Sequence, residues 1–231
     1  MKRFYQKAEA VPAAGGYGVV LDGRVVKTPG MRDLIVPSAV LVGAVAAEWD
    51  AQQGEIRPAT MPLTRLAGAT IDRSVAQREA IVQQIAHYAG TDLVCYRATH
   101  PPALAARQQA VWQPLIDWAV ERYDAPLTVT TGVIPANQPA ASLAVFAEVV
   151  AAHDDFSLTA LHAATTACGS LVIALALLEG RLDAAAAFAA AQLDESCQIE
   201  AWGEDAEQTE RRSALAADIA AAAQFIELVR G

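Results

Sequence analysis

The stretch YGVVLDGRVVKT, residues 17–28, decides the fold class expected for this chain. Two runs rich in valine flank Asp22 and Gly23, and an Asp-Gly pair readily takes the positive φ angles of a type I′ turn. The sequence therefore predicts a β-hairpin that turns at these two residues, and we assign both a structural role. The glycine-rich residues 15–18 lack a P-loop lysine and are interpreted as a flexible entry to the hairpin.

A third strand and a helix are expected after the hairpin. Residues 33–36 have the pattern of a strand, and Ser38 is a typical N-cap for a helix that extends to about Gln53. A small sheet covered by this helix is the simplest packing. Trp49 lies on the apolar face of the helix, so we assign it a role in stability and not in ligand binding. We expect Trp49→Arg to fold poorly, because it buries an unpaired charge.

The composition changes near residue 60 from strand-like to helical, which predicts an N-terminal α/β domain at 1–60 and a larger helical domain at 61–231. The fold class is therefore α+β. Ser74 with Gln77 has the pattern of a capping box. Residues 93–97 fit either a strand or an extended connector, and 127–130 favour an edge strand. Cap residues and apolar periodicity predict helices at 63–71, 74–90, 101–123, 139–152, 157–180, 183–202 and 205–230.

The composition also excludes several classes of protein. Hydrophobic residues make up 54% of the chain, enough for a sizeable core, and the formal net charge is -9. This charge disfavours nucleic acid and anionic membranes and suits a basic partner surface. The apolar run 171–178 is too short to cross a bilayer, which takes about 20 residues. We expect no nucleic-acid partner, no membrane insertion, and no metal or other cofactor, since the cysteines and histidines lack ligand spacing.

The segment LDESCQIEAWGEDAE, residues 193–207, is the most unusual part of the helical domain. It continues a helix in which Phe188, Glu195, Ile199 and Trp202 recur at helical spacing on one apolar face. A carboxylate on such a face is costly to bury unless it is paired or neutralised. Three interpretations of the acids stay open: a solvated helix start, an ion pair of Glu195 with Arg65 or Arg97, and a recognition site for a partner.

An enzyme is the main alternative. Asp194, Glu195 and Glu200 are candidate acid and base groups of a small-molecule-binding or hydrolytic enzyme. However, Glu195 and Glu200 are five positions apart and point to different faces of a helix. A purely structural assembly subunit is the third hypothesis.

Seven segments, read together, resemble a known protein family. They are KRFY at 2–5, LDGRVVKTP at 21–29, AAEWDAQ at 46–52, MPLTRLAGATID at 61–72, TDLVCYR at 91–97, WQPLIDWA at 112–119 and the segment 193–207. In their order and spacing they resemble the assembly chaperone for the α subunit of the F-type ATP synthase, a family of mitochondria and α-proteobacteria. The resemblance covers nearly the whole chain.

The resemblance implies a non-catalytic protein that binds the unassembled α subunit and prevents its aggregation. It also implies a small α/β domain followed by a helical domain. The resemblance also implies that a glutamate of the last motif is important for function, and Glu195 and Glu207 both match it. Gln198 and Trp202 of the same motif are further candidates for partner binding.

Two features of the chain depart from the mitochondrial pattern. Mitochondrial members have a presequence, and this chain shows none, so a bacterial cytoplasmic protein is expected. The last motif of mitochondrial relatives often has a richer acidic run, where this chain has Asp194 and Ser196. The sequence does not determine the oligomeric state, and a monomer is the simplest expectation.

Overall fold

The computed structural model describes residues 1–73, 75–132, 134 and 136–231, and the chain divides into two compact units. Unit 1 comprises Met1–Arg78, Asp154–Ala160 and Gln224–Gly231, and unit 2 comprises Glu79–His153 and Leu161–Ala223. Late segments of the chain thus return to unit 1. The predicted division into domains at 1–60 and 61–231 stays a prediction.

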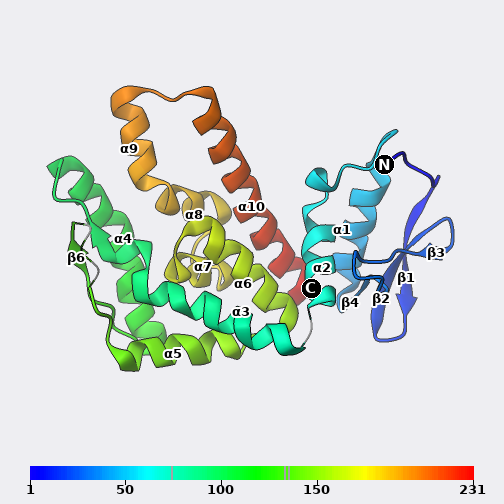
Figure 1. Ribbon diagram of the computed structural model, residues 1–231, viewed down its shortest axis with the longest axis horizontal. Helices are drawn as coiled ribbons and strands as arrows, with labels where there is room; N and C mark the ends of the chain where they lie inside the picture. Colours follow the sequence, from blue (N-terminus) through cyan, green and yellow to red (C-terminus); the bar gives the residue numbers. More distant parts are fainter. Residues whose placement is uncertain (74, 133, 135) are drawn as a thin grey trace. The chain divides into compact units, whose positions relative to one another are not determined.

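Unit 1 contains a small antiparallel sheet covered on one face by a helix (Figure 1). Its regular elements up to Asp72 are β1 Ala8–Ala13, β2 Gly16–Leu21, β3 Arg24–Val25, β4 Ile35–Val36, α1 Ala39–Asp50, the 3₁₀ turn η1 Pro58–Thr60 and α2 Pro62–Asp72. The central strand β2 pairs with β1, β3 and β4. This arrangement confirms the predicted sheet with its covering helix.

The predicted hairpin is confirmed. Leu21 pairs with Arg24, and the two turn residues have positive φ angles of 48° at Asp22 and 81° at Gly23. The Asp22 carboxylate also accepts hydrogen bonds from the backbone N–H groups of Gln6 and Lys7, which lowers its pKa. The turn is thereby tied to the chain that leads into β1.

Strand β1 was not predicted, and the interpretation of residues 15–18 as a flexible entry was wrong. Ala13 pairs with Gly16, the first residue of β2, and Ala14 and Gly15 form a second tight turn in which Gly15 has a φ angle of 86°. The sequence AEAVPA of β1 contains alanine, glutamate and Pro12, all poor strand formers. A proline is tolerated there because β1 pairs only with β2 and is an edge strand.

The first helix begins as predicted, since the Ser38 hydroxyl accepts hydrogen bonds from the backbone N–H groups of Val40 and Leu41. It ends at Asp50, three residues before the predicted end. The first returning segment joins α2 through a Thr70–Thr159 hydroxyl hydrogen bond of 2.8 Å, and the stacked rings of Phe156 and Phe225 join the two returning segments to each other. The predicted capping box at Ser74 lies outside the described residues.

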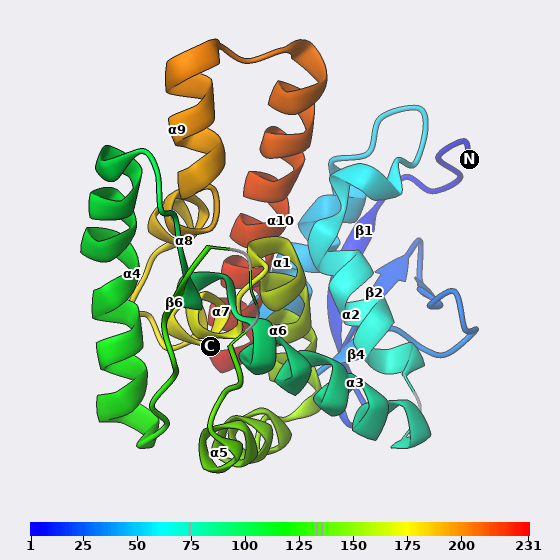
Figure 2. The same ribbon diagram turned by 60° about the vertical axis from the view of Figure 1, so that its left-hand side comes forward.

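The remaining elements form or enter the helical unit 2, in agreement with the predicted helical region (Figure 2). They are α3 Val75–His87, η2 Tyr88–Thr91, η3 Leu93–Cys95, β5 Tyr96–Arg97, α4 Pro102–Tyr123, β6 Thr130–Thr131, α5 Ala140–Ala151, α6 Asp155–Cys168, α7 Leu171–Leu178, α8 Ala184–Ala191, α9 Leu193–Trp202 and α10 Ala206–Arg230. Residues 93–97 were predicted as a strand or an extended connector, and residues 127–130 as an edge strand. These two segments end in the short strands β5 and β6, which pair in parallel.

The single helix predicted at 157–180 is two helices. Gly169 has a φ angle of 63°, and the Ser170 hydroxyl caps α7 by accepting a hydrogen bond from the backbone N–H of Ile173. The cap of α6 is Asp154 and not Ser157, because the Asp154 carboxylate accepts from the N–H groups of Phe156 and Ser157. Apolar periodicity continued across the break and concealed it.

The core of unit 2 forms around α7, in which all eight residues are buried. Trp112 of α4 is fully buried, and its indole N–H donates to the Ala190 carbonyl oxygen at 2.9 Å. The buried Asp92 carboxylate accepts hydrogen bonds from the Ser170 hydroxyl at 2.5 Å and the Val172 N–H at 3.0 Å. Burial raises the pKa of Asp92 to about 6. Asp92 thus links η3 to the start of α7.

Candidate functional site

The segment 193–207 forms helix α9, a short connection, and the first residues of α10 (Figures 1 and 2). The long helix predicted at 183–202 is wrong, because Gln192 leaves the helical conformation with φ and ψ of -110° and 26°. Asp183 caps α8 as predicted, but Phe188 lies on α8 while Glu195 and Ile199 lie on α9. The continuous apolar face expected through Trp202 therefore does not form.

Helix α9 is held mainly by polar contacts. Leu193 is its only buried residue. From α4, the Gln108 amide donates to the Asp194 carboxylate at 2.7 Å, and the Arg107 guanidinium pairs with Glu200 at 2.7 Å. Arg107 also donates to the Cys197 sulfur at 3.3 Å. Hydrogen bonding to Glu200 raises the pKa of Arg107.

Arg212 of α10 holds α9 from its other side. Its guanidinium donates to the Ser196 hydroxyl at 3.1 Å and the Gln192 side-chain oxygen at 3.4 Å, and it pairs with Glu204 at 3.4 Å. It also lies 5.3 Å from the centre of the Phe188 ring. Sequence reasoning missed Arg107, Gln108 and Arg212, because nothing local marks a residue whose partner is far along the chain.

Of the four residues predicted to bind a partner, Glu195, Gln198 and Trp202 lie on α9 and Glu207 lies in the first turn of α10. Trp202 has 82% of its surface exposed. Gln198 and Glu207 are exposed, and Glu195 is half-buried. Within the described part of unit 2, the side chain of Glu195 takes part in no hydrogen bond or ion pair. The Arg97 guanidinium instead donates to the Val94 carbonyl and lies over the Trp112 ring, so the alternative ion pair of Glu195 with Arg97 is wrong, while the one with Arg65 stays a prediction.

The three carboxylates of the enzyme hypothesis do not converge on one point. The Asp194 carboxylate accepts a hydrogen bond from Gln108, and Glu200 pairs with Arg107. Glu195 is half-buried and makes neither of these contacts. The largest pKa shifts lie elsewhere, at Asp92, Cys95, Tyr123 and Cys168, where burial raises the pKa. Among the described residues there is also no cluster of side chains able to hold a metal ion.

Comparisons with known proteins identify the family. The sequence model of the ATP12 chaperone protein family matches residues 2–120. The crystal structure of Atp12 from Paracoccus denitrificans is 41% identical, with a TM-score of 0.94 over 99% of this chain and 98% of that chain. The chain belongs to the ATP12 chaperone family. Members of this family are assembly factors of ATP synthase.

Two further relatives agree with this assignment to the ATP12 family. The Atu1473 protein from Agrobacterium tumefaciens is 38% identical, with a TM-score of 0.93 over 98% of this chain and 85% of that one. The mitochondrial protein atp12 of Schizosaccharomyces pombe is 24% identical over 221 residues, 90% of this chain and 76% of the relative. The expected family and α+β fold are thus confirmed. No helix in the described residues is long and apolar enough to cross a membrane.

Proposed function

We propose that this ATP12 family protein holds the unassembled α subunit of ATP synthase through the exposed face of α9 and the connection to α10, and that it is not an enzyme. The observation that carries the proposal is the exposure of Trp202. A tryptophan that leaves 82% of its surface in water forgoes the stabilisation of burial. Such residues are enriched at the centres of protein interfaces.

The charges around Trp202 indicate which kind of surface it meets. Glu200, Glu204, Asp205 and Glu207 lie within five residues of it, and all are exposed. Arg107 and Arg212 neutralise two of these acids, and Glu195 has no cationic partner within the described part of unit 2. A partner surface with an apolar patch and basic groups is therefore the complementary one.

The bacterial and mitochondrial relatives also bear on location. The solved relatives come from bacteria, and the S. pombe relative is named as mitochondrial. Identity is higher to the bacterial proteins, so we place this protein in the bacterial cytoplasm. No feature of α9 requires a second copy of the chain, and a monomer remains our proposal for the free protein.

An aggregation assay with isolated α subunit, paired with thermal melts, tests this function. The wild-type protein should suppress aggregation at stoichiometric concentrations. Glu195→Gln and Glu207→Gln keep size and hydrogen-bonding capacity while removing the charge. We expect at least one variant to melt like the wild type and to hold the α subunit poorly, with Glu195 the first candidate. Normal holding by both variants would exclude these acids, and failure of the wild-type protein would exclude the α subunit as client.

A further inference from the structure

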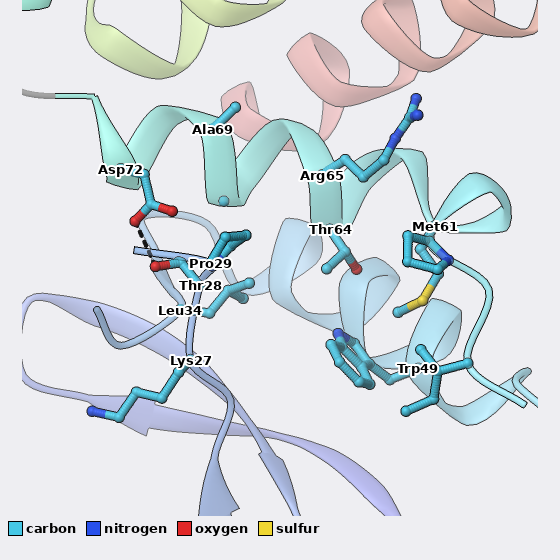
Figure 3. Close-up of a pocket in the computed structure, with 13 residues that line it drawn as sticks. Lys27, Thr28, Pro29, Leu34, Trp49, Met61, Thr64, Arg65, Ala69 and Asp72 are labelled. Carbon is cyan, nitrogen blue, oxygen red and sulfur yellow. Dashed lines mark hydrogen bonds between the residues drawn. The ribbon is translucent and has the colours of Figure 1, made fainter. Parts of the chain in front are cut away.

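Unit 1 contains a cavity of about 470 Å³ that the proposed function leaves unused (Figure 3). Its wall comes from three parts of unit 1: the loop that leads into β4, helix α1, and the segment that contains α2. Leu34, Trp49 and Thr64 converge from these three parts, with Pro29 and Met61 beside them. The side chains of Lys27 and Arg65 line the rim and point away from the cavity in Figure 3.

One polar group in the cavity wall lacks a partner. The Trp49 indole nitrogen is buried and has no hydrogen-bond partner among the described residues. The neighbouring polar groups are satisfied, because the Thr64 hydroxyl donates to Glu48 at 2.7 Å and the Asp72 carboxylate accepts from Thr28 at 2.5 Å. A buried N–H without an acceptor is unfavourable and is rare in folded proteins. An acceptor supplied by a ligand would remove this cost.

A glycine in the same wall has no structural reason to be there. Gly68 lies in the middle of α2, where glycine is less stable than alanine. Its backbone does not have a positive φ angle, and a Cβ atom added to it would meet only Pro29 Cδ, at an ordinary contact distance of 3.8 Å. Alanine would therefore fit. What the glycine does provide is free space at the floor of the cavity.

We propose that this cavity binds bulky apolar side chains of a partner polypeptide, with a backbone carbonyl of the bound segment accepting a hydrogen bond from the Trp49 indole. A small charged metabolite fits poorly, because no cationic or unpaired anionic group points into the cavity. An extended apolar segment supplies both the side chains and the carbonyl. The proposal rests on the proposed function, in that the segment belongs to the unassembled subunit. It departs from the sequence-based assignment of Trp49 to stability and not to ligand binding, because the unpartnered indole N–H gains a role as hydrogen-bond donor to the bound segment.

The structure offers a matched pair of variants for the test. Gly68→Leu fills the cavity from its floor, whereas Gly43→Leu places the same side chain on α1, where nothing lies within 4 Å of the added Cβ. Both changes replace a helical glycine by a better helix former, so neither is expected to lower the melting temperature. We expect Gly68→Leu to weaken binding of the isolated α subunit by about 10- to 100-fold, as for loss of one buried apolar side chain. Gly43→Leu should bind like the wild type.

A second measurement keeps the test decisive if Gly68→Leu folds poorly. Gly68→Cys places a thiol in the cavity, and its rate of alkylation is measured with and without the α subunit. We expect the bound subunit to slow alkylation at least tenfold, whereas a thiol introduced by Gly43→Cys stays equally reactive. Wild-type binding by Gly68→Leu, or unchanged alkylation of Gly68→Cys in the complex, would overturn the inference. Absence of α-subunit binding by the wild type would instead overturn the proposed function.

Discussion

Helices α7 and α9 belong to the same unit and are similar in length, yet they are stabilised in opposite ways. All eight residues of α7 are buried and apolar, and its N-terminus is capped by Ser170 and Asp92. Only one of the ten residues of α9 is buried, and the rest of its attachment is polar. Burial of apolar surface is the largest favourable term in folding, whereas exposed ion pairs contribute little.

This difference separates stability from function within unit 2. Removing α7 from the core would expose eight apolar residues, so its opening should approach global unfolding. Opening of α9 breaks a few side-chain hydrogen bonds and exposes one leucine. A helix held in this way can present Trp202 and its acids to a partner, and can adjust to that partner, without loss of the fold.

The largest effect is expected in α7. Leu175→Ala removes a fully buried side chain and should lower the free energy of unfolding by about 2–5 kcal/mol. Ile199→Ala in α9 is the matched change at a half-buried position and should cost clearly less. Urea denaturation of both variants measures the difference. Equal losses would show that α9 contributes to the core as α7 does.

The cap of α7 should make stability depend on pH. The pKa of Asp92 is raised from 3.8 to about 6, so the folded protein keeps this proton between about pH 4 and pH 6 while the unfolded chain releases it. The contribution of Asp92 to stability is therefore greatest below pH 4, falls as pH rises to 6, and is constant above it. The fall amounts to about 3 kcal/mol. Asp92→Asn should remove it, as measured by denaturation at pH 4 and pH 7.

An intermediate effect is expected where α9 is attached. Arg212→Ala removes the contacts to Gln192, Ser196 and Glu204 and should cost about 1 kcal/mol of global stability. Amide exchange in α9 should become faster, while exchange in α7 stays unchanged. Arg211→Ala, at the exposed neighbouring position, is the control. Faster exchange in both helices would mean that they open as one unit.

The smallest effect on stability is expected at Trp202. Since the side chain is 82% exposed, Trp202→Ala should change the free energy of unfolding by no more than about 0.5 kcal/mol. If Trp202 anchors the partner, the same variant should nevertheless weaken holding of the α subunit at least about tenfold. Val111→Ala, an exposed apolar position of α4, should change neither property. Undiminished holding by Trp202→Ala would remove the observation on which the proposed function rests.

Features of the fold that depend on neighbouring residues were predicted correctly, whereas features that depend on contacts between residues far apart in sequence were missed. The Asp22-Gly23 turn and the Ser38 cap depend on neighbouring residues and were predicted correctly. The breaks at Gly169 and Gln192 were missed because the apolar period ran across them. Strand β1 was missed because pairing with β2, and not its own composition, makes it a strand.

The candidate site was predictable in part. Its position in sequence followed from the unusual acids of 193–207, but its geometry did not. The prediction that Glu195 lies on a continuous apolar face required a single helix, and the structure has two. The contacts of Arg107 and Arg212 with α9, and the cavity beside Trp49, are formed by residues that tertiary packing brings together. No local sequence pattern predicts such contacts.

Hydrogen exchange of the protein alone and in complex with the α subunit tests the central claim most directly. In the free protein we expect the amides of α9 to exchange much faster than those of α7, because few buried contacts protect them. Binding of the α subunit should slow exchange in α9 and at the start of α10 and leave α7 as slow as before. Exchange in α9 that is unchanged by the bound subunit would contradict the assignment of this helix as the partner-binding element.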